Sequence, residues 1–399
     1  MKENCDFLIV GAGIIGLTVA RELRKRHSKS KIIVIEKESE IGLHASGRNS
    51  GVLHSGIYYG GDTLKAKMCA SGAKRMRDFA NEYNIPCIKT GKVITANSEG
   101  DLPIINSLMQ NSRDNNINAK LLNEDEIREI EPHATPYKLG IYSPDTAVID
   151  SIVVIKRLYM LLLDQGVEFK FNSRVIKQDA GRKSVTTCAS EFSYGFLYNC
   201  AGAYADQVAK LFGRGEDYTM IPFKGIYYKL RPERSNFING SIYPVPDIKL
   251  PFLGVHITKV INGDVYVGPT AIPALGRENY GFFQGLKLKE GVGIGSELIK
   301  MYLNNNNNFR LLSHTEVAKY FKPWFLRSAQ KLVSDLTYKD LIPSNKVGIR
   351  PQLVNIKTKS LEMDYILERE ENSIHVLNSI SPAFTSSLAF SEYIVDRSQ

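Results

Sequence analysis

The sequence predicts an α/β fold (α+β overall) with two domains, a parallel-sheet domain for a dinucleotide and an inserted antiparallel β-rich domain. Three observations predict this fold. A glycine-rich turn joins a short apolar strand to a helix near the N-terminus, and an acidic residue ends the next strand. A long β-rich segment, interrupted by Pro and Gly, occupies the middle of the chain. The length of 399 residues suits two domains better than a minimal binding module.

The N-terminal segment has the pattern of a Rossmann-like βαβ unit. A strand at residues 6–10 and a helix at 17–26 flank the turn Gly11-Ala12-Gly13-Ile14-Ile15-Gly16. We expect Gly11 to permit the tight turn, Gly13 to let the backbone approach a pyrophosphate, and Gly16 to let helix and strand pack closely. The helix N-terminus would attract the phosphates. The alternative is a glycine turn that binds no ligand.

The next strand, at residues 32–35, completes the unit and ends in an acidic residue. Glu36 lies 20 residues after Gly16, where a carboxylate can accept hydrogen bonds from the ribose hydroxyls, and Lys37 follows it. These two residues are therefore predicted to contact the cofactor.

Residues 42–59 form a loop rich in small and polar residues, at the point where an ordinary Rossmann domain would continue into a helix. Small residues let backbone amides approach a flat cofactor, which suits a flavin better than a mobile nicotinamide. The predicted cofactor contacts in this loop are Ser46, Arg48, Asn49 and Ser50, and the polar groups at its edge include His54, Tyr58 and Tyr59. A helical pattern resumes at residues 64–83.

The remaining elements predict a discontinuous cofactor domain. We expect strands at residues 92–96, 167–171, 174–176 and 196–202, helices from 101 and over 153–165, and a capping pair of Asn123 with Glu126. Val175, Ala201 and Gly202 are predicted cofactor contacts. Residues 218–269 predict an antiparallel sheet, and 304–308 a surface loop. The cofactor domain is expected to comprise 1–85, 145–216 and 340–399, and the substrate domain 86–144 and 217–339.

The C-terminal segment predicts strands around residues 346–350 and 374–378, and then a Ser/Thr-rich helix start. Thr385, Ser386 and Ser387 stand at this start, where free N–H groups could face the flavin pyrimidine. Simple helix capping by Ser and Thr explains the same residues equally well.

Composition and charge exclude several classes of protein. The net charge of +9 would attract anionic substrates, nucleic acid or an acidic bilayer, but no basic stretch alternates with aromatics, so we expect no nucleic-acid partner. Five cysteines without a CxxC pair predict neither a disulfide framework nor a zinc site, and we expect no metal. With no signal peptide and no long apolar run, we expect a cytoplasmic protein, in contact with a membrane only peripherally, at the inner face of the cell membrane.

The chain resembles the D-amino-acid-oxidase-like FAD flavoproteins, and within them the L-2-hydroxyglutarate dehydrogenase/oxidase group. The resemblance covers nearly the whole chain, and its most specific segments are residues 54–59, 64–67, 221–225, 243–247, 251–258, 348–350 and 381–389. It implies FAD-dependent oxidation of the 2-hydroxyl of L-2-hydroxyglutarate to 2-oxoglutarate, with hydride transfer from C2 to flavin N5. It also implies that electrons pass to oxygen or to a membrane acceptor such as a quinone.

The sequence departs from the pattern of that group at four positions: Lys224 for arginine, Ile226 for glutamate, Thr270 for asparagine and Pro351 for alanine. Lys224 keeps a positive charge but loses the planar fork that grips a carboxylate. The exact substrate preference is therefore less fixed than the flavin site.

The resemblance places His54 and His256 near flavin and substrate, and either could be the base that removes the hydroxyl proton. His54 could instead anchor FAD covalently. Arg350, in a Gly-x-Arg context, is the expected grip on the substrate carboxylate and also a cofactor contact. The other predicted substrate contacts are Tyr58, Tyr59 and Thr258, with Lys67, Lys224 and Arg277 as candidates for a second carboxylate.

Three other functions remain as alternatives. A flavoprotein of the same fold could oxidise an amine such as glycine or sarcosine, which needs only one carboxylate grip. A flavoprotein could also bind FAD without turnover. A nicotinamide-linked dehydrogenase is disfavoured by the flavin-type loop and by the lack of a second GxGxxG motif.

Overall fold

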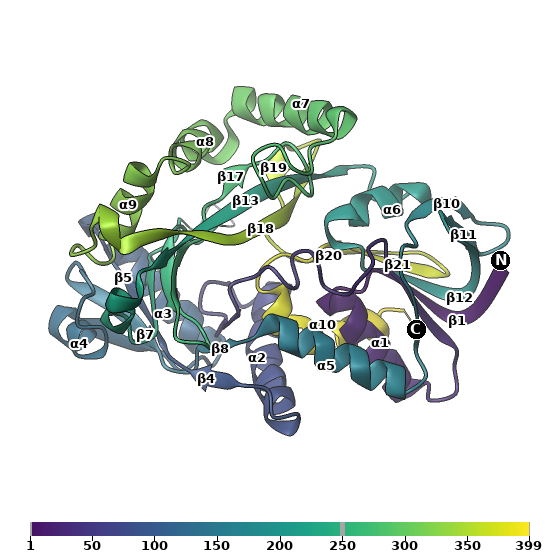
Figure 1. Ribbon diagram of the computed structural model, residues 1–399, viewed down its shortest axis with the longest axis horizontal. Helices are drawn as coiled ribbons and strands as arrows, with labels where there is room; N and C mark the ends of the chain where they lie inside the picture. The colour runs from purple at the N-terminus through teal and green to yellow at the C-terminus, as the bar shows by residue number, and fades with distance from the viewer. Residues whose placement is uncertain (1, 248–251, 399) are drawn as a thin grey trace.

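The computed structural model describes residues 2–247 and 252–398, so Pro251 of the resemblance segments lies outside the described residues. Two large sheets occupy opposite ends of the molecule, and helices cover their outer sides (Figure 1). Among the described residues, no helix is both long enough and apolar enough to cross a bilayer.

The first sheet is the predicted parallel sheet, and it is assembled from distant parts of the chain. Its parallel strands lie in the order β9 (Glu168–Lys170), β2 (Ile32–Ile35), β1 (Lys2–Val10), β12 (Glu191–Asn199) and β21 (Ser373–Asn378). Antiparallel strands extend its edges: β10 (Val175–Asp179), β11 (Ser184–Thr187) and β20 (Ile366–Arg369).

Helices cover both faces of this sheet, and alternate residues of β1 therefore enter different cores. Ile9 packs toward α1 (Ile14–Arg26), α2 (Leu64–Glu82), α5 (Ser151–Asp164) and α10 (Ala383–Asp396). Leu8 and Val10 face the opposite side, where α6 (Ala205–Leu211) packs. A strand buried on both faces reads as a continuous apolar run, which is why residues 6–10 could be predicted from the sequence.

Helices α2 and α10 approach each other closely at a glycine. A Cβ atom on Gly72 would lie 2.5 Å from the Cα of Ser386. The Ser/Thr-rich start of α10 is therefore fixed against α2, beneath the cavity between the sheets.

The second sheet is largely antiparallel and has ten strands. In order across the sheet they are β19 (Ser360–Leu361), β18 (Leu341–Asn355), β13 (Tyr218–Leu230), β16 (Val265–Gly268), β15 (His256–Lys259), β14 (Ser241–Pro244), β5 (Lys92–Thr95), β7 (Leu139–Ser143) and β6 (Lys120–Asn123), while β17 (Ile272–Pro273) pairs with β13. Helices α7 (Leu288–Asn304), α8 (Phe309–Ala318) and α9 (Lys322–Gln330) run along its outer side (Figure 1).

Strand β18 moves one expected domain boundary. It pairs with β13 from Leu341 to Asn355, so residues 341–355 belong to the second sheet and not to the cofactor domain, where the division at residue 340 places them. Strand β19 pairs with β18, so it also lies in the second sheet, although the expected range 340–399 assigns it to the cofactor domain.

The remaining elements lie outside the two large sheets. They are the strands β3 (Val52–Leu53), β8 (Ala147–Ile149) and β4 (Cys87–Lys89), the helices α3 (Leu102–Asp114) and α4 (Glu124–Ile130), and the 3₁₀ turns 99–101, 202–204, 232–237, 306–308 and 338–340. The capping pair of Asn123 with Glu126 is confirmed at the start of α4. Helix α5 begins at Ser151, two residues before its expected start, because the side chain of Asp150 caps it.

Candidate functional site

A cavity of about 650 Å³ lies between the two sheets. One wall is the carboxyl end of the parallel sheet with the glycine turn and the loop after β2, and the other wall comes from β13, β15 and β18. Ligands of open α/β sheets bind at the carboxyl ends of the parallel strands, and this cavity has that position.

The glycine turn is shaped as its sequence predicts. Gly11 has a φ of +105°, and a Cβ atom there would lie 2.5 Å from the Cys200 carbonyl oxygen. A Cβ atom on Gly16 would lie 1.9 Å from the carbonyl oxygen of Gly11, so only glycine lets helix and strand come this close. Gly13 lines the cavity, and the N-terminus of α1 opens toward it.

Two side chains organise the mouth of this turn. Ser46 Oγ accepts a hydrogen bond of 2.9 Å from the backbone N–H of Ile14, in the first turn of α1. Glu36 accepts from the N–H groups of Ala12 at 2.7 Å and Glu38 at 3.0 Å, so its carboxylate is held in place where it lines the cavity. Each oxygen keeps a second lone pair for a ribose hydroxyl.

Most of the predicted cofactor residues line the cavity: Gly11, Gly13, Ile14, Ile15, Glu36, Lys37, Ser46, Arg48, Asn49, Ser50, Val175, Ala201, Gly202, Arg350 and Thr385. Ser386 and Ser387 do not. Their hydroxyls donate to the carbonyls of Pro382 and Phe384. No described side chain caps the start of α10, so the capping alternative does not describe these residues either. Thr385 Oγ1 accepts from the backbone N–H of His54 at 3.2 Å and so ties α10 to the flavin-type loop.

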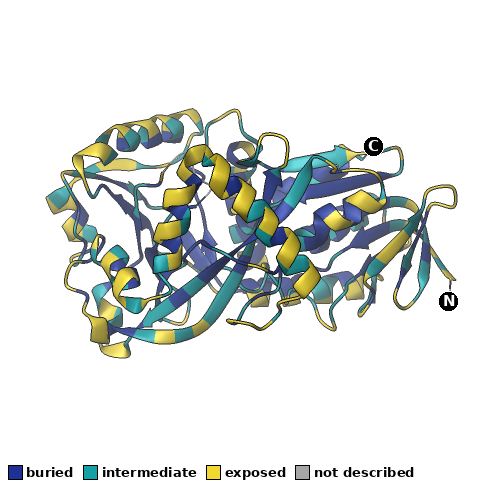
Figure 2. Cartoon of the chain, turned by 90° about the horizontal axis from the view of Figure 1, so that it is seen from above, coloured by how far each residue is buried: buried dark blue, intermediate teal, exposed yellow. Residues whose placement is uncertain are grey.

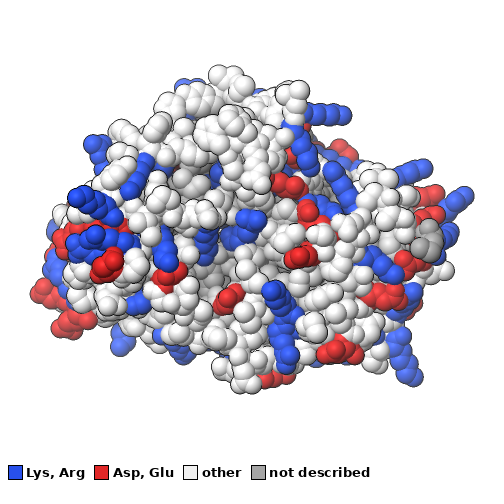
Figure 3. Space-filling view, in the orientation of Figure 1, with Lys and Arg blue, Asp and Glu red and all other residues white. Residues whose placement is uncertain are grey.

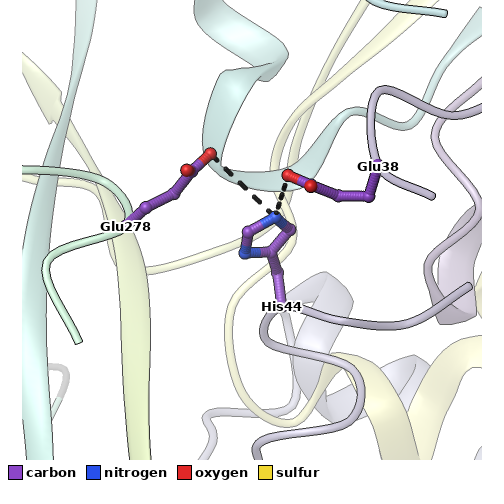
Figure 4. A group of neighbouring side chains, drawn as sticks. All are labelled: Glu38, His44 and Glu278. Atoms are coloured by element: carbon purple, nitrogen blue, oxygen red, sulfur yellow. Dashed lines mark hydrogen bonds and ion pairs between the residues drawn. The ribbon is translucent and has the colours of Figure 1, made fainter. Parts of the chain in front are cut away.

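A network of charged side chains closes the cavity beside Glu36, and we call it the latch (Figure 4). Lys37 Nζ donates to Glu278 at 2.6 Å and also bonds Glu38, while His44 Nδ1 lies 2.7 Å from the hydroxyl of Tyr280. Glu278 and Tyr280 come from the loop after β17, so the latch joins the two walls of the cavity.

The latch also contains three side chains with metal-ligand chemistry. The nearest ligand atoms of Glu38, His44 and Glu278 lie within 4.8 Å of one another. The Lys37 ammonium already bonds both carboxylates, so a cation of the protein occupies this position. Although burial raises the pKa of Glu278, its hydrogen bonds with Lys37 and Tyr204 lower that pKa to about 2.

At the other end of the cavity lie the predicted catalytic residues, His54, His256 and Arg350. His256 Nδ1 lies 3.0 Å from the carbonyl oxygen of Gly254, which can only accept, so Nδ1 carries the proton and Nε2 the free lone pair. Burial lowers the pKa of His256 to about 3. Burial, with the charges of Lys92, His256 and Arg350, lowers the pKa of His54 well below its usual range. Both imidazoles are therefore neutral at physiological pH.

Arg350, which is half-buried, and Lys92, which is fully buried, are basic side chains without a carboxylate partner among the described residues. Arg350 Nε has no hydrogen-bond partner, and burial lowers the pKa of this guanidinium to about 10. Lys92 Nζ is also unpartnered and lies 4.4 Å and 5.1 Å from the ring centres of Tyr58 and Tyr243. Burial lowers the pKa of Lys92 to about 7.

Lys92 and Lys65 were not predicted from the sequence. The buried face of α2 follows the spacing Lys65, Cys69, Gly72, Met76 and Phe79, so Lys65 falls on an apolar helical stripe, a signal that could have revealed it. Burial and the charge of Arg350 lower the pKa of Lys65 to about 7. No sequence signal distinguishes Lys92 from an ordinary lysine at the start of a strand.

Three predicted contacts for a second carboxylate do not fit. Lys67 is exposed on the outer face of α2. Lys224 points away from the cavity, because alternate residues of β13, Phe223 and Gly225, line it. Arg277 lines the cavity, but its guanidinium already pairs with Asp206 and, at 3.2 Å, with Glu290.

The remaining predicted substrate contacts lie outside the cavity wall. Tyr58, Tyr59 and Thr258 are not part of the cavity wall. The Tyr58 hydroxyl and Thr258 Oγ1 are buried without hydrogen-bond partners, and burial raises the pKa of both Tyr58 and Tyr59. These residues give the cations a polar but uncharged environment.

Comparison with known proteins gives a family and a set of relatives. The family model described as FAD dependent oxidoreductase matches residues 6–397. The L-2-hydroxyglutarate dehydrogenase of Indibacter alkaliphilus is 34% identical, with 96% of each chain covered. That of Escherichia coli strain K12 is 33% identical over 99% of this chain and 93% of the relative.

Solved structures share the fold. L-α-glycerophosphate oxidase from Mycoplasma pneumoniae, with FAD bound, has a TM-score of 0.78 at 23% identity, with 99% of this chain and 95% of that chain covered. Glycine oxidase from Geobacillus kaustophilus has a TM-score of 0.74 at 16% identity, with 100% of this chain and 96% of that chain covered.

The latch predicts how the cofactor is retained. Glu278→Gln removes the charge that holds Lys37, and we expect FAD to dissociate roughly tenfold more readily, about 1.4 kcal/mol. Flavin fluorescence during dilution measures the release. Asp78→Asn, which breaks an exposed ion pair with Lys74, is the control and should release FAD as the unaltered protein does. If both variants released FAD at the same rate, the latch would have no role in cofactor binding.

Proposed function

This chain belongs to the FAD-dependent oxidoreductase family, and on that premise we propose that it oxidises the 2-hydroxyl group of L-2-hydroxyglutarate to give 2-oxoglutarate. The observation that supports the substrate is the pair of basic side chains, Arg350 and Lys92, whose buried nitrogens Nε and Nζ have no hydrogen-bond partner and which have no carboxylate partner among the described residues. The identity of 34% to an L-2-hydroxyglutarate dehydrogenase over 96% of both chains supports the same substrate.

A dicarboxylate suits this site because burying an unpaired cation costs free energy that an incoming anion offsets. Arg350 lines the cavity and offers a planar fork, so we assign it the carboxylate next to the reacting carbon. Lys92 lies behind the cavity wall, close enough to His54 and His256 to lower the pKa of both. We propose that the Lys92 ammonium attracts the second carboxylate of the substrate.

The residues of the cavity fit FAD. Gly13 presents bare backbone to the cavity, and the nearest atom to a Cβ there would be Ser46 Oγ at 3.0 Å, so a pyrophosphate can approach the α1 N-terminus. Glu36 would hold the ribose, and the latch would enclose that end. When bound, FAD supplies a two-electron acceptor for the hydride that leaves the substrate.

Loss of a hydride from the hydroxyl-bearing carbon requires that the hydroxyl also lose a proton. A neutral imidazole can accept it, and both His54 and His256 are neutral. The Gly254 carbonyl holds Nδ1–H of His256 and so directs the basic nitrogen elsewhere. Arg350 would orient the substrate toward these nitrogens.

Oxidation of an amine is the second candidate. The glycine oxidase of Geobacillus kaustophilus shares the fold, at 16% identity. An amino acid with one carboxylate would leave Lys92 uncompensated, so the observation that favours a dicarboxylate disfavours this candidate.

For the electron acceptor we propose a quinone or another component of a membrane electron-transport chain, with oxygen as the alternative. We also propose that the chain contacts an anionic membrane surface peripherally, from the cytoplasmic side. The net charge of +9 supports this contact.

The central test is an anaerobic visible spectrum of the purified protein. Addition of L-2-hydroxyglutarate should bleach the flavin absorbance, while D-2-hydroxyglutarate and sarcosine should leave it unchanged. Bleaching by sarcosine alone would establish amine oxidation instead. Purification of the protein without bound flavin would contradict the assignment of FAD as the cofactor.

The two cations should have separable effects on the kinetics. Arg350→Ala should raise KM about 100-fold for every 2-hydroxy acid, roughly 2.7 kcal/mol, with FAD still bound. Lys92→Met should lower kcat/KM for L-2-hydroxyglutarate and leave a 2-hydroxy monocarboxylate such as L-2-hydroxybutyrate almost unaffected. Lys67→Met is the matched control. An equal loss on both substrates would remove Lys92 from recognition of the second carboxylate.

The histidines can be separated by stopped-flow reduction of the flavin. Replacement of the base by Ala should slow reduction about 10²- to 10⁴-fold, and replacement of its neighbour much less. Because the pKa of His256 is about 3, a base at that position stays unprotonated from pH 8 down to pH 6, so its protonation produces no acid limb there. Normal reduction in both His54→Ala and His256→Ala would exclude an imidazole base.

A further inference from the structure

Exposed apolar side chains are concentrated in one part of the surface, which we call the apolar rim. Of the 25 large hydrophobic residues that are exposed among the described residues, 13 lie between Leu275 and Trp324. The rim comprises Leu275, Phe282, Phe283, Leu286, Leu288, Val292, Ile299, Tyr302, Leu303, Leu311, Val317, Phe321 and Trp324. A soluble surface scatters such residues singly, whereas a gathered set marks an interaction site.

Helix α7 shows that the exposure is organised. Its core contact is made by Ile294 and Met301, while Leu288, Val292, Ile299 and Leu303 are exposed at intervals of four, seven and four residues. That spacing forms a stripe along one helix face. In the view from above the helices along this side are largely exposed, so no described part of the chain covers the stripe (Figure 2).

The two phenylalanines at the edge of the rim are held outward by buried polar groups. Phe282 and Phe283 are 74% and 76% exposed. Asn279 Nδ2 donates to the carbonyls of Gly281, Phe282 and Gln284, and Lys224 Nζ donates to that of Gly281 at 2.6 Å. A buried lysine and asparagine that fix this loop maintain the exposure of both rings.

The charge around the rim is positive. From Leu275 to the end of α9 the chain has eight Lys and Arg residues against four glutamates. All four glutamates are in ion pairs, with Lys37, Arg277, Lys300 and Lys319. Lys287, Lys289, Arg310, Lys322 and Arg327 have no ion pair with a described residue. In Figure 3 the surface over α7 and α8 is mostly uncharged, with basic side chains at its margins.

We propose that the apolar rim inserts into the interface of an anionic bilayer, with the unpaired lysines and arginines on the lipid headgroups. An apolar helix face bordered by basic residues is the pattern of helices that lie in a membrane interface. A second copy of this chain would bring the same positive charge to the same face, which disfavours a symmetric dimer there. The inference deepens the peripheral contact proposed above and names its surface.

The test is flotation of the full FAD-loaded chain with vesicles. The protein should bind vesicles of phosphatidylglycerol mixed with phosphatidylcholine, bind phosphatidylcholine alone weakly, and dissociate as salt increases. Combined Phe282→Ser, Phe283→Ser, Leu288→Ser and Val292→Ser should weaken binding about tenfold or more. Lys287→Gln with Lys289→Gln should weaken binding to the anionic vesicles alone.

The matched control replaces four exposed hydrophobic residues elsewhere, Ile88→Ser, Ile152→Ser, Met160→Ser and Leu163→Ser, and should bind as the unaltered chain does. Equal binding by rim and control variants would overturn the proposal. The proposal would also be overturned if the unaltered chain did not bind vesicles and light scattering showed it to be a dimer that becomes a monomer only in the rim variant. Reduction of the flavin by L-2-hydroxyglutarate, measured without vesicles, should be normal in every variant, and its absence in all would contradict the proposed function and not the rim.

Discussion

Positive charge buried without a balancing carboxylate is the constraint on which the site depends. Arg350 comes from β18, Lys92 from β5 and Lys65 from α2, so elements far apart in the sequence place cations around one end of the cavity. Each charge is removed from water, which is unfavourable unless an anion or a polar shell replaces the solvent. Tyrosines supply part of that shell. The positive charge of Lys92, added to the larger effect of burial, disfavours a proton on either His54 or His256. Affinity for an anion and the availability of a base thus have the same electrostatic origin.

The cofactor half of the fold could be predicted because its chemistry is local. The turn from Gly11 to Gly16 and the acid at Glu36 act through backbone geometry over a short stretch, so their spacing specifies their role. The resemblance to a family then supplied His54, His256 and Arg350, which the structure brings to one cavity. The positions of these residues along the sequence do not give the distances between them in space, and only the fold shows that they are neighbours.

Errors arose where orientation decides the role of a residue. Lys67 and Lys65 differ by two positions on a helix, which turns one outward and the other into the core. Lys224 and Phe223 differ by one position on a strand, so their side chains lie on opposite faces of the sheet. The pairing of Arg277 with Asp206 and Glu290 depends on tertiary contacts that no local pattern reports. Ser386 and Ser387 show the same limit, because their hydroxyls bond within their own helix.

The loop from Gly276 to Gly285 contains two of the features described above. Glu278 and Tyr280 belong to the latch beside Glu36, and Phe282 and Phe283 belong to the apolar rim. Asn279, between Glu278 and Tyr280, bonds to Lys224 and to the carbonyls of Gly281 and Gln284, so it ties the latch part of the loop to the rim part. Thermodynamic linkage makes any coupling through this loop reciprocal: if a partner at the rim tightens cofactor binding, the cofactor strengthens that partner's binding by the same factor. Under the membrane contact proposed for the apolar rim, loss of FAD would therefore also weaken binding to the bilayer.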